Sequence, residues 1–257
     1  MSSEAPFLEI ENLTVKFGGL TALDNVSLKV PQNSVVSLIG PNGAGKTTVF
    51  NSISGFVQPQ SGEIKIAGQK TAWPKTHKLA ALKISRTLQG VGLFSGITAL
   101  ENVMLGSDHK YKAGIVKDLF GLSGRIDRQL RDSAMAQLER FGALSLADKF
   151  PHELSYPDTK RIALARALIS EPELILLDEP AAGLGQDDID ELAETIRQLK
   201  KSCAVLLVEH HVDFVGEVSD QVYVLDFGRI IAAGDFESVK KSPEVLAAYL
   251  GGEVGHA

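Results

Sequence analysis

The sequence predicts an α/β fold with a mainly parallel core sheet. From residue 159 onward, helical segments alternate with apolar strand-like segments, a pattern typical of βαβ units. The predicted helices are 159–170 and 187–200, and the predicted strands are 174–177, 204–208, 222–225 and 229–233. An earlier strand, 35–39, is largely apolar at consecutive positions, which is typical of a strand covered on both faces.

The first third of the chain carries short β-like runs separated by turn signals, at 8–17, 26–30, 35–39 and 63–67. Residues 90–157 are mostly helical in pattern. The apolar spacing there predicts an amphipathic helix over 125–141 that is ended by Gly142, and no structure is predicted for 107–124. We therefore expect one domain over residues 7–252, with a helical insertion at about 90–157 and tails at 1–6 and 253–257.

Composition indicates a packed globular protein, because 44% of the 257 residues are hydrophobic and 23% are charged. The formal net charge of −6 argues against nucleic acid as the main partner, since phosphate backbones favour basic surfaces. The N-terminal MSSEAPF has no signal-peptide pattern, and no apolar run approaches the ~18 residues that span a bilayer. We expect a cytoplasmic chain that reaches a membrane through partners. Cys203, in an apolar run, is expected to be reduced and buried.

A glycine-rich segment between strand 35–39 and a helical stretch at 48–54 fits the pattern G-x-x-x-x-G-K-[ST]. Its residues are Gly40, Pro41, Asn42, Gly43, Ala44, Gly45, Lys46, Thr47 and Thr48. Glycines let successive backbone N–H groups face one anion, and the following helix adds its positive N-terminal end. Lys46 supplies a charge for the β- and γ-phosphates of a nucleotide, and Thr47 a hydroxyl for Mg²⁺. An ordinary turn would not require the Lys-Thr pair.

Two carboxylates, Asp178 and Glu179, follow the apolar strand 174–177. The carboxyl ends of parallel strands border the crevice in which ligands bind. Asp178 suits Mg²⁺ binding through water, and Glu179 suits accepting a proton from an attacking water. An acidic turn that caps a helix is the alternative, and the phosphate loop favours the functional interpretation.

These residues resemble those of ABC-type ATPases over nearly the whole chain. The resemblance rests on the phosphate loop, the acidic strand with Pro180 and Gly183-Leu184 after it, and Leu154-Ser155 with the helical run 161–168 before it. Within the family, the segments 17–23, 121–122, 228–234 and 248–252 look most like the ATPases of branched-chain amino-acid importers. The resemblance implies a P-loop NTPase fold with an N-terminal antiparallel β subdomain and an inserted helical subdomain.

The resemblance also implies roles for single residues. Phe17 matches the aromatic on which the family stacks adenine, and Gln89 matches the glutamine that touches Mg²⁺ and the attacking water. His210 matches the switch histidine that contacts the γ-phosphate, whereas His211 is expected to be exposed without a role. The implied cofactors are ATP and Mg²⁺, with Thr47, Gln89 and Asp178 at the metal and Glu179, His210, Gln89 and Lys46 as catalytic residues.

The sequence departs from the family where the signature usually reads Leu-Ser-Gly-Gly-Gln. Here it is Leu154-Ser155-Tyr156-Pro157-Asp158, and Gly185 replaces a common Asp or Asn. In the family this segment reaches the γ-phosphate of a partner subunit, which would make Ser155 an ATP ligand in trans. Pro157 has no N–H to donate, and Asp158 would repel a polyphosphate. Two explanations stay open: a heterodimer with unequal sites, or a symmetric pair in which Ser155 and a helix N-terminus around Thr159 suffice.

The expected function is the energy subunit of an importer for branched-chain or other hydrophobic amino acids or related small amides. Its expected partners are a second ATPase subunit, two membrane permeases and, indirectly, a substrate-binding protein. One alternative is a soluble ABC ATPase outside transport, although the sequence has no coiled-coil arms, tandem copy or basic tracts. Another is a weakly hydrolysing regulatory subunit, which Pro157 and Asp158 favour and the intact Lys46, Asp178, Glu179 and His210 oppose.

Overall fold

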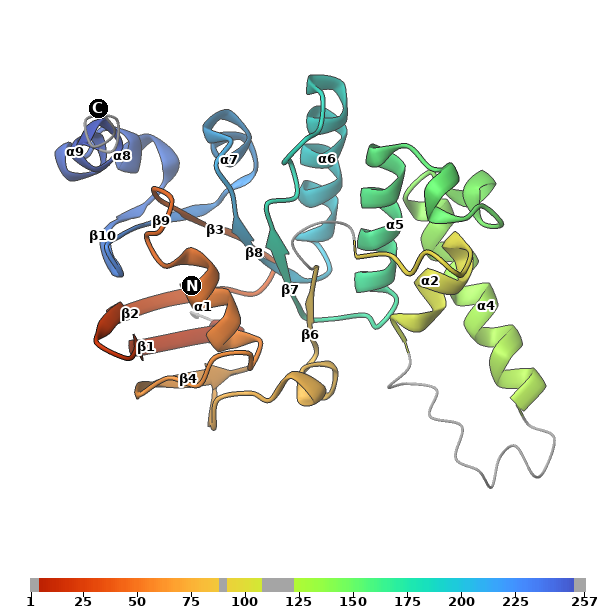
Figure 1. The fold of residues 1–257 in the computed structure, drawn as a ribbon, viewed down its shortest axis with the longest axis horizontal. Helices are drawn as coiled ribbons and strands as arrows, with labels where there is room; N and C mark the ends of the chain where they lie inside the picture. Colours follow the sequence, from red (N-terminus) through yellow and green to blue (C-terminus); the bar gives the residue numbers. More distant parts are fainter. Residues whose placement is uncertain (1–4, 88–91, 108–122, 252–257) are drawn as a thin grey trace. The chain divides into compact units, whose positions relative to one another are not determined.

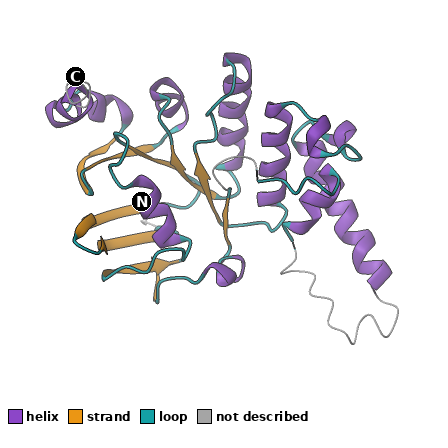
Figure 2. Cartoon of the chain, viewed as in Figure 1, coloured by secondary structure: helices purple, strands orange, loops and turns teal. Residues whose placement is uncertain are grey.

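The computed structural model describes residues 5–87, 92–107 and 123–251, and the chain divides into two compact units (Figure 1). Unit 1 comprises residues 1–82 and 176–257, and unit 2 comprises residues 83–175. Unit 1 contains two sheets and the helices that follow their strands, whereas unit 2 is largely helical (Figure 2).

The N-terminal sheet of unit 1 is antiparallel, as expected, with the order β2-β1-β4-β5. Its strands are β1 (Leu8–Phe17), β2 (Leu20–Val30), β4 (Ser61–Ile66) and β5 (Gln69–Thr71). Leu8 faces Val30 on one side and Ile66 on the other. The predicted start of β2 at residue 26 is wrong, because β2 pairs with β1 back to the Phe17–Leu20 turn. Irregularities in this ladder interrupt the alternation of buried and exposed residues that would have marked the first half of the strand.

The second sheet carries the predicted parallel core. Within unit 1 its order is β10-β9-β3-β8-β7, and β3 runs parallel to both β8 and β9, while β10 returns antiparallel to β9. Its strands are β3 (Val35–Ile39), β7 (Leu174–Asp178), β8 (Ala204–Val208), β9 (Gln221–Asp226) and β10 (Arg229–Gly234). Every residue of β3, β7 and β8 is buried, as their apolar runs predict. Cys203, just before β8, is buried and reduced.

The helices of unit 1 follow the strands of this sheet. They are α1 (Lys46–Ile53), α6 (Gln186–Leu199), α7 (Val212–Val218), α8 (Phe236–Lys240) and α9 (Pro243–Gly251). The predicted helix 187–200 matches α6 to within one residue at each end. It buries one apolar stripe at helical spacing, formed by Ile189, Leu192, Ala193, Ile196 and Leu199. The helical spacing of these buried residues is the pattern that predicts this helix from the sequence.

Unit 2 contains one short strand and three longer helices among its described residues. They are β6 (Ile84–Arg86), α2 (Ala99–Leu105), α4 (Ser123–Arg140) and α5 (Tyr156–Leu168). Gly142, at φ +64°, follows the end of α4 as predicted, and the N–H of Ala143 donates to Leu138 O. The predicted start of α5 at residue 159 is wrong. Ser155 caps the helix, and Pro157 lies in its first turn, where the missing N–H has no intrahelical partner to lose.

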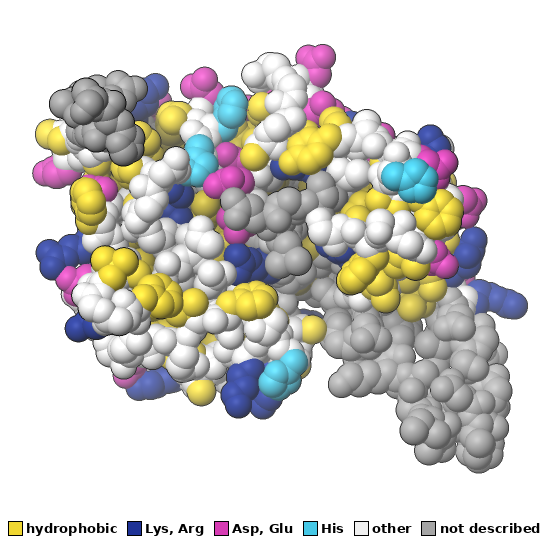
Figure 3. Space-filling view, in the orientation of Figure 1, with side chains coloured by type: hydrophobic (Ala, Val, Ile, Leu, Met, Phe, Trp, Pro, Cys, Tyr) yellow, Lys and Arg dark blue, Asp and Glu magenta, His cyan; other side chains and the backbone are white. Residues whose placement is uncertain are grey.

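The surface mixes side chains of different kinds. On the face in Figure 3, acidic and basic side chains are not segregated by charge, and hydrophobic side chains gather in several clusters among them. Among the described residues, the helices are too short or too polar to cross a bilayer.

We predict that Leu206→Ala, in the buried strand β8, lowers the free energy of unfolding by about 2–5 kcal/mol, since it leaves a cavity at a fully buried site. The control is Leu20→Ala, where the residue is 67% exposed and a change within about 0.5 kcal/mol is expected. Urea unfolding of the full chain measures both. Equal losses in the two variants would contradict the burial assigned to β8.

Candidate nucleotide-binding site

The loop between β3 and α1 is shaped by two glycines. Gly40 has φ +150°, and a Cβ there would lie 2.0 Å from Leu225 O. Gly45 has φ +110°, and a Cβ would lie 2.8 Å from a methyl carbon of Leu23. Both positions combine a backbone conformation that favours glycine with a lack of space for any side chain. The loop therefore lies close against β2 and β9 and presents its backbone rather than side chains.

Lys46, the first residue of α1, lies at the end of this loop with 6% of its surface exposed. Its Nζ donates to Gly40 O at 2.7 Å and to Pro41 O at 2.9 Å. Burial lowers the pKa of Lys46, and the charges of Glu179 and Asp178 act in the opposite direction. The ammonium group of Lys46 is thus largely removed from water and bound to the carbonyls at the start of the loop, an arrangement suited to binding a polyphosphate.

The predicted acidic pair lies at the end of β7. Asp178 is the last residue of the strand and is 6% exposed, and Glu179 follows with φ +49°. The N–H of Glu179 donates to Val208 O at 2.9 Å, which joins the ends of β7 and β8. His210 Nε2 lies 2.8 Å from Glu179 Oε1, so these two residues meet although 31 positions separate them. His211 is exposed, as expected.

Glu209 is a buried carboxylate in this region that belongs to no recognisable sequence motif. It is 3% exposed and accepts backbone hydrogen bonds from Ala181, His210 and His211. The only local signal is an acidic residue directly between the apolar strand and His210.

The remaining predicted residues of unit 1 lie around the loop. Phe17 ends β1 opposite Leu20 and is 50% exposed, so its ring is accessible. Thr47 is the second residue of α1 and is exposed, which leaves its hydroxyl accessible beside the loop. Gln89 lies outside the described residues.

In unit 2, the polar groups of the altered signature segment form hydrogen bonds within the same chain. Ser155 Oγ accepts from the N–H of Asp158 at 3.2 Å and donates to Asp158 Oδ2 at 2.6 Å. Arg161 donates to Asp158 Oδ1 at 2.9 Å. The serine hydroxyl and the start of α5 therefore interact with a carboxylate of the same chain, which itself has a cationic partner.

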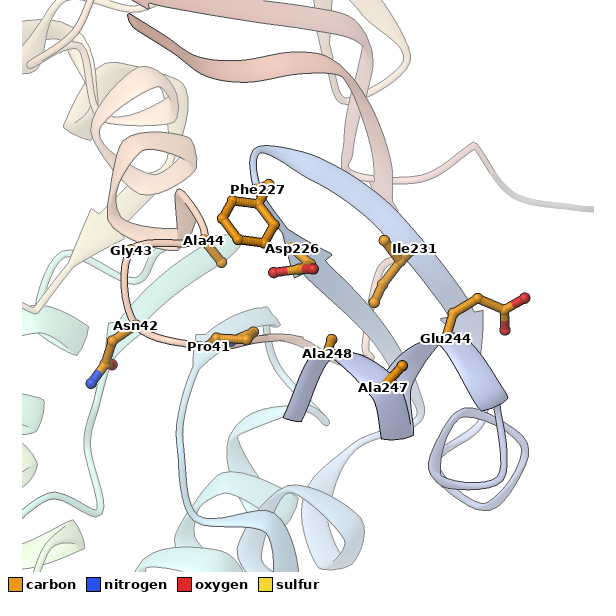
Figure 4. A pocket seen from close by; sticks show the side chains of 10 residues that line it. All are labelled: Pro41, Asn42, Gly43, Ala44, Asp226, Phe227, Ile231, Glu244, Ala247 and Ala248. Carbon is orange, nitrogen blue, oxygen red and sulfur yellow. The ribbon is translucent and has the colours of Figure 1, made fainter. Parts of the chain in front are cut away.

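A pocket of about 640 Å³ borders the first half of the phosphate loop (Figure 4). Its lining is Pro41, Asn42, Gly43, Ala44, Asp226, Phe227, Ile231, Glu244, Ala247 and Ala248. The β9–β10 turn and α9 thus flank the loop, and Gly228 N donates to Ala44 O at 2.9 Å. Tyr249 of α9 reaches the loop as well: burial raises the pKa of Tyr249, and a hydrogen bond with the Gly40 backbone opposes that shift. These contacts hold the loop against the β9–β10 turn and α9.

A buried strand, a glycine-bounded loop and a helix that begins with a buried lysine define a nucleotide-binding protein of the phosphate-loop class. Residues 23–182 match the ABC transporter family, and the chain belongs to that family. As a member it binds ATP and hydrolyses it to ADP and phosphate.

Three similar proteins agree with this assignment. The chain is 38% identical over 250 residues to the high-affinity branched-chain amino acid transport ATP-binding protein LivG of Escherichia coli (strain K12), covering 96% of this chain and 98% of LivG. The ADP conformation of MJ1267, an ATP-binding cassette of an ABC transporter, superimposes with a TM-score of 0.82 at 29% identity, covering 96% and 99% of the two chains. The dimeric post-hydrolysis state of the ATP-binding cassette MJ0796, bound to ADP and Pi, superimposes with a TM-score of 0.74 at 26% identity. The match covers 89% of this chain and 98% of the MJ0796 chain.

We predict that Ser155→Ala lowers the free energy of unfolding of the nucleotide-free chain by about 1 kcal/mol, because it removes the N-cap of α5. Ser95→Ala is the control, since Ser95 is exposed in the same unit, and we expect a change within about 0.5 kcal/mol. Urea unfolding of both full-length variants gives the comparison. If Ser155→Ala is as stable as Ser95→Ala, the cap does not stabilise the helix.

Proposed function

We propose that this chain powers an importer of branched-chain or other hydrophobic amino acids, or of related small amides. The observation that carries the proposal is the meeting of Glu179 with His210 in a chain that also holds Lys46 at the phosphate loop. The similarity to LivG over nearly the whole chain supports the transport role. The proposed partners are a second ATPase subunit, two membrane permeases and, through them, a substrate-binding protein, with this chain peripheral on the cytoplasmic face of the cell membrane.

The proposed site binds ATP through the loop 40–48. The backbone N–H groups and Lys46 bind the β- and γ-phosphates, and Phe17 stacks on adenine. Thr47, Asp178 and Gln89 would hold Mg²⁺, and the oxygen donors among them fit this ion. When bound, Mg²⁺ neutralises negative charge on the phosphates.

The proposed chemistry is an in-line attack of water on the γ-phosphorus. Glu179 accepts the proton of the attacking water, while the bond between the γ-phosphorus and the bridging oxygen breaks to leave ADP and phosphate. The contact of 2.8 Å between His210 Nε2 and Glu179 Oε1 supports a paired role for these residues, in which the Glu179 carboxylate accepts from the Nε2–H of His210. From that position His210 contacts the γ-phosphate and orients the base.

Unequal catalytic sites are the second part of the proposal. The contacts of Ser155 and Asp158 within α5 favour a heterodimer in which this chain supplies intact residues to one composite site and a weak signature to the other. The same contacts would suit a regulatory subunit with weak hydrolysis, and turnover in the complex separates the two.

We predict that Glu179→Gln traps ATP and stabilises the dimer with the partner subunit, because the amide cannot accept the proton of the attacking water. ATP turnover of the complex should fall at least about 100-fold, within the 10²–10⁴-fold contribution of a general base. Uptake of radiolabelled leucine into cells should fall with it, whereas the control Glu191→Gln, on the exposed face of α6, should change neither. Hydrolysis at the unmutated rate would refute the role of Glu179 as the base. Unchanged leucine uptake would refute leucine as a transported substrate.

We also predict that Pro157→Gly combined with Asp158→Gln raises ATP turnover of the reconstituted complex. The change restores an N–H and removes a carboxylate from the start of α5. The control is Asp132→Asn on α4, which removes a charge elsewhere in unit 2. Turnover that does not rise would mean that the altered signature does not limit hydrolysis.

A further inference from the structure

A buried carboxylate holds together the two segments that carry Glu179 and His210. Glu209 follows β8 and is 3% exposed. Its Oε1 accepts from the N–H of Ala181 at 2.7 Å, and its Oε2 accepts from the N–H groups of His210 at 2.8 Å and His211 at 3.2 Å. Both oxygens are therefore used, one toward each segment.

These hydrogen bonds lie just beyond the ends of the strands, where the backbone N–H groups no longer have acceptors within the sheet. β7 ends at Asp178 and β8 ends at Val208, so the N–H groups beyond them need other acceptors. A buried carboxylate in turn requires donors, because its charge is costly to remove from water without hydrogen bonds. The Glu209 carboxylate accepts from the three N–H groups, and each side supplies the hydrogen bonds that the other needs. Loss of the carboxylate would therefore leave these N–H groups without their acceptor.

The segments joined in this way carry the catalytic pair. Glu179 has φ +49° and donates its own N–H to Val208 O, and Ala181 lies two residues further along. On the other segment, the backbone of His210 is held by Oε2 of Glu209, while its ring lies 2.8 Å from Glu179. A shift of either segment would change the distance between Glu179 and His210.

We propose that Glu209 is a positioning residue for ATP hydrolysis, which acts by fixing the backbone of the Glu179 and His210 segments relative to each other. It acts through those two residues and does not itself contact the nucleotide. The proposal rests on the catalytic roles proposed for Glu179 and His210. It assigns a function to the acidic residue that precedes the switch histidine in this chain.

Glu209→Gln is the sharpest test, since the amide has nearly the same size. Its oxygen can still accept on one side, but its nitrogen brings N–H donors to the side where the carboxylate accepted. All three bonds cannot persist. We expect kcat of the full-length chain, assembled with its partner subunits, to fall at least about tenfold because small misplacements of catalytic groups have large effects. KM for MgATP and the affinity for MgATP should stay within about twofold of the unmutated values, since the phosphate loop is unchanged.

Two further measurements separate positioning from loss of structure. The control Glu237→Gln changes an exposed glutamate that pairs with Lys241, and kcat should be unaffected. In a His210→Ala background, Glu209→Gln should cause little further loss, because residues that act through one another are not additive. Where that background turns over too slowly to compare, the ¹⁵N signal of His210 Nε2 should move in Glu209→Gln toward that of a free imidazole.

Several outcomes overturn the proposal. One is an unchanged kcat for Glu209→Gln in a chain whose unmutated form hydrolyses ATP. Another is a parallel loss of MgATP affinity and thermal stability, which would indicate a structural role alone. An equal fractional loss with and without His210, or an unshifted His210 signal, would show that Glu209 does not act through the histidine. Absence of hydrolysis by the unmutated complex would instead refute the proposed function.

Discussion

The strands β3, β8 and β7 are buried at every position, and the residues proposed to act on the nucleotide follow their carboxyl ends. Within the strands, the sheet satisfies the backbone. At their carboxyl ends the hydrogen-bonded ladder stops, and N–H groups need new acceptors. The phosphate loop follows β3, the acidic pair ends β7, and Glu209 with His210 follows β8. One edge of the sheet therefore gathers residues from three distant parts of the chain.

Buried charges at this edge are compensated by backbone groups. Lys46 is held by two loop carbonyls, and Glu209 by three N–H groups. Neutral carbonyl oxygens are weaker partners for an ammonium group than phosphate oxygens are, because a phosphate adds the attraction between two opposite full charges. Folding has already removed Lys46 from water, so a nucleotide that replaces the carbonyls gains a stronger contact without that desolvation cost. Preorganisation of this kind favours binding of a polyphosphate.

Much of this edge could be predicted because its signals are local. The phosphate loop is one contiguous pattern, and Asp178 and Glu179 directly follow an apolar run. Other features depend on distant partners. The bond from Ala181 to Glu209 spans 28 positions, so no local pattern distinguishes Glu209 from a solvated acid. The start of α5 was predicted too late because the hydrogen bonds of Ser155, rather than apolar spacing, mark its first turn. The roles of Phe17 and Gln89 rest on resemblance and stay predictions.

The two units differ in how far their functional residues keep the family pattern. In unit 1 the phosphate loop, the acidic pair and His210 are all present. In unit 2 the start of α5 faces a carboxylate of its own chain. A helix N-terminus carries a partial positive charge of about half a unit, which an adjacent anion largely offsets. A phosphate approaching Ser155 would have to displace Asp158 from the hydroxyl and from Arg161, or accept its repulsion. A partner subunit whose signature segment has no such carboxylate would therefore complete the site that contains Lys46 and Glu179. The composite site formed with that partner would hydrolyse ATP faster than the site that uses Ser155 of this chain.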